Sequence, residues 1–310
     1  MHRDLSLYIK KEASLINISF ATLAFIILFF TETSYYLLIL QTGIVDYFHS
    51  DMSKIWMIPV GGVLGILSIA KIQHRSVVVS IALFFQTLLM FFYPSFNGLM
   101  LFALGFLSGL VAPYLIYQLK SLRYVVVILG LSYLLGTLAI SIAPENRGDL
   151  AIVLSIAALF SSYFTVPVLQ KEHKKVALKT YGTIFSWLVL DATLFEVLSR
   201  SESAIWGNSE FTLSIAFFHL LGLYLGYKLS DFKRNNLIIL TLFACSYFLF
   251  ALNLSYLLAI VYPIVISYYN VIILKKFMTL SFEELTLVSL SLWMSAGIGL
   301  SIALIFHNLI

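Results

Sequence analysis

Two acidic residues interrupt long apolar stretches of the sequence and are the first candidates for chemistry. Asp191 lies near the middle of the stretch Tyr181–Ser199, and Glu32 lies inside the first apolar stretch, residues 19–40. An ionised carboxylate in hydrocarbon costs about 2.5 kcal/mol or more, so such residues usually face a polar cavity, pair with a neighbour or carry a proton. Both are therefore candidates for binding a proton or a cationic solute. For each, helix-to-helix bonding with neighbouring Thr, Tyr or Lys side chains remains the alternative.

Two further polar side chains lie deep in apolar stretches. His219 is the only histidine so placed, and Gln86 lies in the third stretch. A histidine ionises near neutral pH, which suits a proton relay, whereas a lone membrane histidine also serves as a hydrogen-bonding contact between helices. Both residues are candidates for the same polar site.

Two prolines occur beside polar aromatic residues in the fourth and tenth stretches. Pro113 precedes Tyr114, and Pro263 follows Tyr262 and precedes Tyr268, Tyr269 and Asn270. Proline removes one backbone hydrogen bond and bends a helix. We therefore expect Tyr114, Tyr269 and Asn270 to line a cavity.

Other motifs favour ordinary structural roles. Glu196 precedes Arg200 by four residues, which favours a surface ion pair. The loop 46–51 contains two acids and His49 but no fourth ligand, so a solvated loop is favoured over a metal site. The single cysteine, Cys245, excludes a disulfide framework, and no glycine loop with Lys-Ser/Thr indicates nucleotide binding. The sequence therefore predicts no metal, no cofactor and no nucleic-acid partner.

The composition indicates which elements must position these residues. Of 310 residues, 61% are hydrophobic and 11% are charged, and the mean hydropathy is +0.98. These values are typical of a polytopic membrane protein, and the stretches have helical rather than strand length. The sequence thus predicts an all-α fold with eleven transmembrane helices in contact with a lipid bilayer, although the short ninth stretch leaves ten or twelve open. The stretches lie near residues 14–41, 53–71, 76–93, 97–119, 122–143, 149–169, 180–199, 211–229, 236–252, 254–275 and 284–307.

The basic residues follow one side of the predicted membrane. With a cytoplasmic N-terminus, sixteen Lys and Arg residues fall inside, and only Lys54, Arg147 and Arg200 fall outside. Cytoplasmic loops are rich in Lys and Arg, so this distribution supports the span count. It predicts an integral protein of the plasma membrane, or inner membrane of a bacterium, with an outer C-terminus.

The longest cytoplasmic connection divides the chain into two bundles. The charged segment Gln170–Lys179 would link six spans in residues 1–169 to five spans in residues 180–310. Spans two to five and eight to eleven begin about 160 residues apart, as expected for a duplicated unit. Small residues form stripes in Gly130–Ala143 and Ser291–Leu304, which predict close helix packing.

The chain resembles the major facilitator superfamily. The resemblance rests on the basic turn GILSIAKIQHRS from Gly65, its counterpart GYKLSDFKRNN from Gly226, the glycine-patterned fifth span and the basic linker. In that family an acid and basic residues of the turn latch the two halves together, which implies a latch role for Asp231, Lys233 and Arg234. The first-half turn departs from the pattern, because Ile69 stands where the acid is expected.

The resemblance implies a rocker-switch carrier whose first and seventh helices line a cavity between the halves. Glu32 and Asp191 would then face one aqueous space. The expected function is secondary transport of a small solute or cation, coupled to protons, in a truncated relative with about eleven spans. The alternatives are a membrane scaffold or assembly factor that does not transport, and a membrane-embedded enzyme. An enzyme is disfavoured, because acids, histidines and serines do not converge at one membrane face.

Overall fold

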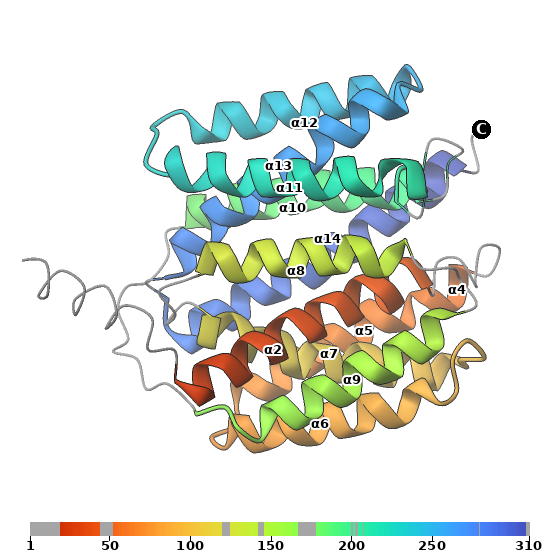
Figure 1. The fold of residues 1–310 in the computed structure, drawn as a ribbon, viewed down its shortest axis with the longest axis vertical. Helices are drawn as coiled ribbons and strands as arrows, with labels where there is room; N and C mark the ends of the chain where they lie inside the picture. Colours follow the sequence, from red (N-terminus) through yellow and green to blue (C-terminus); the bar gives the residue numbers. More distant parts are fainter. Residues whose placement is uncertain are drawn as a thin grey trace, which may run out of the picture.

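The protein is built from long helices that lie side by side (Figure 1). The computed structural model describes residues 19–43, 52–119, 125–141, 146–166, 178–199, 201, 204–206, 208–278 and 280–307. Across these ranges there are eleven long helices and no strand. They are α2 (Phe20–Tyr35), α5 (Met57–Ala70), α6 (Arg75–Met90), α7 (Gly98–Leu119), α8 (Val125–Ile140), α9 (Arg147–Ser162), α10 (Leu178–Leu198), α11 (Ser209–Lys228), α12 (Asn235–Ala251), α13 (Ser255–Phe277) and α14 (Phe282–His307).

The helices confirm the predicted class of polytopic membrane protein. Six of them are long and apolar enough to cross a membrane, and four shorter helices are also apolar. Helix α6 leaves a row of apolar side chains exposed at helical spacing, namely Val77, Ile81, Phe84, Phe85 and Leu88. A continuous apolar face of this kind is stable in contact with lipid.

Helix α2 continues directly into a π-helix that the sequence does not predict. This segment, η1, spans Tyr36–Gly43, and the short α4 spans Met52–Ile55. π-helical turns are rare and occur frequently at functional sites. The change in winding begins at Tyr36, a residue that faces the polar cluster described below.

The ninth and tenth predicted spans are separate helices. Helices α12 and α13 are joined by a turn at Leu252, Asn253 and Leu254, in which Asn253 has a φ of 54°. Asparagine tolerates this left-handed conformation better than most residues. The three-residue connection therefore reverses the chain between two spans.

The helices pack in a similar order in the two parts of the chain. In the first part, α2 contacts α8, α5 contacts α7, and α6 contacts α7; in the second, α10 contacts α14, α11 contacts α13, and α12 contacts α13. Contacts between the parts run from α8 to α11 and from α14 to α5 and α7. In Figure 1, α8, α11 and α14 accordingly lie between the outermost helices α6 and α12. Most of the residues that would link the parts, 167–177, lie outside the described residues.

The predicted small-residue stripes lie at helix contacts. Gly130 of α8 faces Leu220 and Leu223 of α11, and Gly299 of α14 faces Ala192 of α10. The prediction that these stripes serve packing is confirmed at both positions. The contact at Ala192 also brings α14 next to Asp191.

Helices α5 and α7 approach so closely that a glycine is required. A Cβ atom on Gly61 would lie 2.1 Å from the Phe102 carbonyl oxygen, whereas one on Gly182 of α10 would meet nothing within 4 Å. We expect Gly61→Ala to lower the free energy of unfolding by roughly 1–3 kcal/mol, because the backbones must separate. Gly182→Ala is the matched control, and its higher helix propensity should leave stability unchanged or slightly raised. Titration with sodium dodecyl sulfate in mixed micelles measures both, and equal effects would contradict the packing argument.

Candidate functional site

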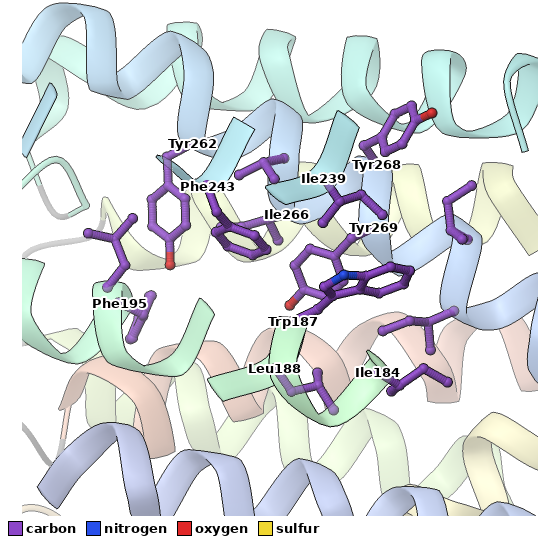
Figure 2. Packing of buried hydrophobic residues seen from close by; sticks show 14 of the residues in the cluster. Ile184, Trp187, Leu188, Phe195, Ile239, Phe243, Tyr262, Ile266, Tyr268 and Tyr269 are labelled. Atoms are coloured by element: carbon purple, nitrogen blue, oxygen red, sulfur yellow. The ribbon is translucent and has the colours of Figure 1, made fainter. Parts of the chain in front are cut away.

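The Asp191 carboxylate lies near the middle of α10 and is held by two tyrosines of α13. The Tyr262 hydroxyl donates to Oδ1 at 2.9 Å, and the Tyr269 hydroxyl donates to Oδ2 at 2.6 Å. Residues seven apart lie on the same face of a helix, so both phenols point toward α10. Figure 2 shows the two rings extending from α13 toward α10, within the apolar cluster that contains Trp187 and Phe243. The apolar cluster thus fixes the rings, and the rings fix the carboxylate.

The backbone of α10 is also fixed around Asp191. The Tyr262 hydroxyl lies 3.0 Å from the Asp191 carbonyl oxygen, and the Tyr247 hydroxyl of α12 donates to the Leu190 carbonyl at 2.7 Å. Hydrogen bonds between neighbouring helices are stabilising inside a membrane, where water is absent. The position of the carboxylate is therefore determined by three helices of the second half of the chain.

Two further tyrosines come from the first half of the chain. Tyr36 of η1 and Tyr133 of α8 lie within electrostatic range of the Asp191 carboxylate. Asp191, Tyr36, Tyr133 and Tyr247 are all partly exposed, whereas Tyr262 and Tyr269 are buried. The aspartate thus sits among five phenols from four other elements, and part of that set is accessible. We call Asp191 with Tyr36, Tyr133, Tyr247, Tyr262 and Tyr269 the tyrosine cluster.

A second polar group joins α8 to α11 and α13 beside the tyrosine cluster. His219 Nδ1 lies 2.7 Å from Ser267 Oγ, and the imidazole stacks on Tyr133 with ring centroids 4.6 Å apart and planes 10° apart. Asn270 Nδ2 donates to the Tyr133 hydroxyl at 2.6 Å. The predicted candidates His219 and Asn270 therefore converge on one tyrosine, which sequence reasoning did not select.

The close approach of α11 and α13 makes the His219 contact possible. A Cβ atom on Gly222 would lie 2.5 Å from the Ile264 carbonyl oxygen, so only glycine permits this helix separation. Gly222 is nearly one turn from His219 on the same face. The imidazole consequently reaches Ser267 and also approaches the Pro263 carbonyl.

Glu32 lies in a different environment from Asp191. Its side chain is 6% exposed, and its Oε2 accepts a 2.8 Å hydrogen bond from Gln86 Nε2 of α6. The structure therefore brings two of the predicted candidates together, but within the first half of the chain. Glu32 and Asp191 share no hydrogen-bonding partner among the described residues. An aqueous space common to both acids stays a prediction.

Of the remaining residues that the sequence singled out, Tyr114 lies in the core of the first half, whereas Glu196 lies beside Tyr36 of the tyrosine cluster. Tyr114 is buried in the core of the first half, near Thr165 and Gln118. Glu196 lies within electrostatic range of Tyr36, and Arg200, its predicted partner, lies outside the described residues. The loop 46–51, with its two acids and histidine, lies outside them too.

The predicted latch residues lie at the loop between α11 and α12. Asp231 pairs with Lys275 of α13, with 3.6 Å between Oδ2 and Nζ, and Lys233 and Arg234 are exposed. This ion pair lies within the second half and is solvent exposed, so its contribution is about 0–1 kcal/mol. A latch between the halves at these three residues stays a prediction.

An aromatic contact that the sequence did not predict does connect the halves. The guanidinium carbon of Arg75 lies 3.7 Å from the ring centroid of Phe282, and Tyr117 meets the same ring edge-to-face at 5.3 Å. Arg75 begins α6, Tyr117 belongs to α7, and Phe282 begins α14. The Phe282 ring is buried, and an aromatic face attracts a guanidinium electrostatically, so this contact stabilises the packing of α14 against α6 and α7.

Sequence reasoning missed Tyr36, Tyr133, Tyr247 and Ser267. The sequence does indicate Tyr262, a polar aromatic residue beside Pro263 that lies seven residues before Tyr269 and so occupies the same helical face. The positions of Tyr36 and Tyr133 carried no comparable signal, since their role depends on helices far apart in sequence.

The sequence matches no protein-family model and no curated protein.

Proposed function

We propose that this protein is a secondary carrier that moves a small solute or cation across the plasma membrane by alternating access, coupled to protons. In this proposal it is a truncated relative of the major facilitator superfamily, with its N-terminus in the cytoplasm. The observation that carries the proposal is the tyrosine cluster, in which a partly exposed carboxylate at mid-helix depth meets residues of both halves. Ionisable groups inside a membrane commonly mark substrate or proton pathways.

The arrangement of the helices supports alternating access. The helix pairs recur in the same order in both parts of the chain, and the most extensive contacts between the parts join α8 to α11 and α14 to α5 and α7. Carriers with internal repeats bind their substrates at the interface between the repeats, near the middle of the bilayer. The proximity of Tyr36 and Tyr133 from the first half to the Asp191 carboxylate of the second half supports a binding site of this kind.

The different surroundings of the two acids support different roles in this proposal. Asp191 is partly exposed and retains carboxylate lone pairs beyond those that accept from Tyr262 and Tyr269. Glu32 is buried against Gln86 inside one bundle. We therefore assign the solute and the proton to Asp191, and we assign Glu32 and Gln86 to the cohesion of the first bundle.

One observation favours the alternative of a membrane scaffold without transport. Both carboxylates already accept hydrogen bonds from protein side chains, as they would if their role were only to hold helices together. A scaffold would keep a single arrangement of the two bundles. A carrier must adopt at least two arrangements of the bundles, and distances between labelled positions on the two bundles distinguish these cases.

Paired spin labels on both membrane sides test the proposal. With Cys245 replaced by Ser, cysteines at the exposed Gln73 and Phe232 report on the predicted cytoplasmic ends, and cysteines at the exposed Ser95 and Leu252 report on the outer ends. We expect distance distributions from electron spin resonance in nanodiscs to contain two populations. Between acidic and alkaline buffer, the inner distance should lengthen as the outer distance shortens, or the reverse. One fixed population for both pairs in all buffers would support the scaffold and exclude the carrier.

A further inference from the structure

The charge of the tyrosine cluster suggests which class of solute it binds. Among the residues that the structure describes, Asp191 forms no ion pair with Lys, Arg or His, and its side-chain partners are phenol hydroxyls. Phenol hydroxyls carry no compensating positive charge. An ionised Asp191 therefore gives the site a net negative charge, which disfavours anionic solutes.

The rings around Asp191 suit a cation further. Tyr36, Tyr133 and Tyr247 are partly exposed, come from three different elements and lie within electrostatic range of the carboxylate; the Tyr247 hydroxyl bonds the carbonyl of the adjacent Leu190. The Tyr36 ring is held edge-to-face against Trp293, with centroids 6.3 Å apart, and Trp206 meets Tyr262 edge-to-face at 5.2 Å. An electron-rich aromatic face attracts a cation, and aromatic cages are a frequent solution for binding quaternary ammonium groups.

A neutral polyol would need a different lining. Sugar-like solutes require several donors and acceptors, yet the amide of Asn270 is engaged with Tyr133, and that of Gln86 with Glu32. The phenols of Tyr262 and Tyr269 are likewise engaged with the carboxylate. One face of the Tyr133 ring is stacked on His219, so the capacity that remains for a ligand includes carboxylate lone pairs of Asp191 and other aromatic ring faces, which together complement a charged amine that carries alkyl groups.

On the basis of the carrier proposed above, we infer that the tyrosine cluster binds an organic cation, an amine or quaternary ammonium whose charge meets Asp191 and whose alkyl groups lie against the tyrosine rings. Because no protein cation is paired with Asp191 among the described residues, a bound ammonium neutralises the carboxylate without displacing one. The inference names the solute class, and it is tested separately from the movement of the helices.

Two pairs of probes isolate the charge of the ligand from its shape. Choline and phenyltrimethylammonium are the cations, and 3,3-dimethyl-1-butanol and tert-butylbenzene are neutral molecules of the same shape. Each is titrated calorimetrically against the full chain in nanodiscs of zwitterionic lipid, with empty nanodiscs as the blank. We expect at least one cation to bind saturably, and its neutral counterpart to bind at least about tenfold more weakly.

Substitutions locate the site. Asp191→Asn should weaken binding of the cation by at least about 30-fold, because one partner of a buried charge pair is removed. Tyr36→Leu should weaken it about tenfold, and Tyr36→Phe much less, because phenylalanine keeps the aromatic face. Glu210→Gln and Tyr256→Leu are matched controls, since Glu210 and Tyr256 form an exposed acid–tyrosine hydrogen bond on the surface. Both controls should bind as the unsubstituted protein does.

The outcomes separate this inference from the carrier proposal. The inference is overturned if neither cation binds saturably, if the neutral counterparts bind equally well, or if Asp191→Asn leaves the affinity unchanged. If the spin labels still exchange between two populations in that case, the carrier stands and its solute is not an organic cation. If a cation binds as expected but the labels stay fixed, the site recognises cations and the carrier proposal fails.

Discussion

Asp191→Asn is expected to abolish solute-coupled proton movement in proteoliposomes, with a loss of at least about 30-fold in initial rate. Asparagine keeps the shape of aspartate and can still accept from Tyr262 or Tyr269, so the helices should remain packed. It can neither carry a negative charge nor exchange a proton. The measurement uses liposomes that contain a pH-sensitive dye and records the response to small amines, amino acids, carboxylic acids and sugars added one at a time.

Controls on the same preparation make this result specific. Glu210→Gln removes an acid that also accepts from a tyrosine, but at the exposed surface, and it should retain the full rate. Thermal unfolding of Asp191→Asn in detergent must resemble that of the unsubstituted chain for the loss to be attributed to chemistry. If Asp191→Asn moves protons with solute at an unchanged rate, the assignment of both proton and solute to Asp191 is wrong.

Gln86→Leu is expected to destabilise the first bundle by about 3 kcal/mol. The Gln86 amide donates the hydrogen bond that the structure records for the buried Glu32 carboxylate, and leucine cannot replace it. A buried polar group left without its partner costs about 1–3 kcal/mol, and more if it is charged. Titration with sodium dodecyl sulfate in mixed micelles gives the change in unfolding free energy.

A double-mutant cycle attributes this cost to the pair of side chains. Glu32→Met together with Gln86→Leu replaces both polar groups by apolar ones of similar volume, which is often neutral or stabilising. We expect the double variant to regain most of the stability that Gln86→Leu loses. Glu32→Gln should be tolerated, because its amide oxygen can still accept from Gln86. Additive losses in the double variant would show that Glu32 and Gln86 do not act as a pair.

The Gln86 result also bears on the role of Glu32. A strong energetic coupling between Glu32 and Gln86 supports a structural role for Glu32, in which it holds α2 against α6. The sequence alone left both this role and a binding role open for Glu32. If the coupling is absent, the Glu32 carboxylate does not depend on Gln86, and the binding role regains support. The Asp191 carboxylate does not depend on one donor in this way, because Oδ1 accepts from Tyr262 and Oδ2 accepts from Tyr269.

The sequence by itself determined the class of fold and the positions of the helices. The eleven predicted spans correspond to the eleven long helices in the described residues, and the break at Asn253 separates α12 from α13, as the count of eleven required. Length and hydropathy are local properties, so each span can be recognised without reference to the others. Asp191 was identified for the same reason, because the cost of a charge in hydrocarbon depends on its own position along one helix.

Only the tertiary structure decided which side chains meet. A membrane helix is apolar toward lipid and toward protein, so the pattern of a single helix does not reveal which face turns inward. Tyr36 and Tyr133 approach Asp191 from elements more than 50 residues away in sequence, and the winding of η1 helps to set the direction of Tyr36. The pairing of Glu32 with Gln86, rather than with the space around Asp191, likewise depends on the packing of α2 against its neighbours. Contacts between distant helices are fixed by the fit of whole surfaces, and that fit exists only once the chain has folded.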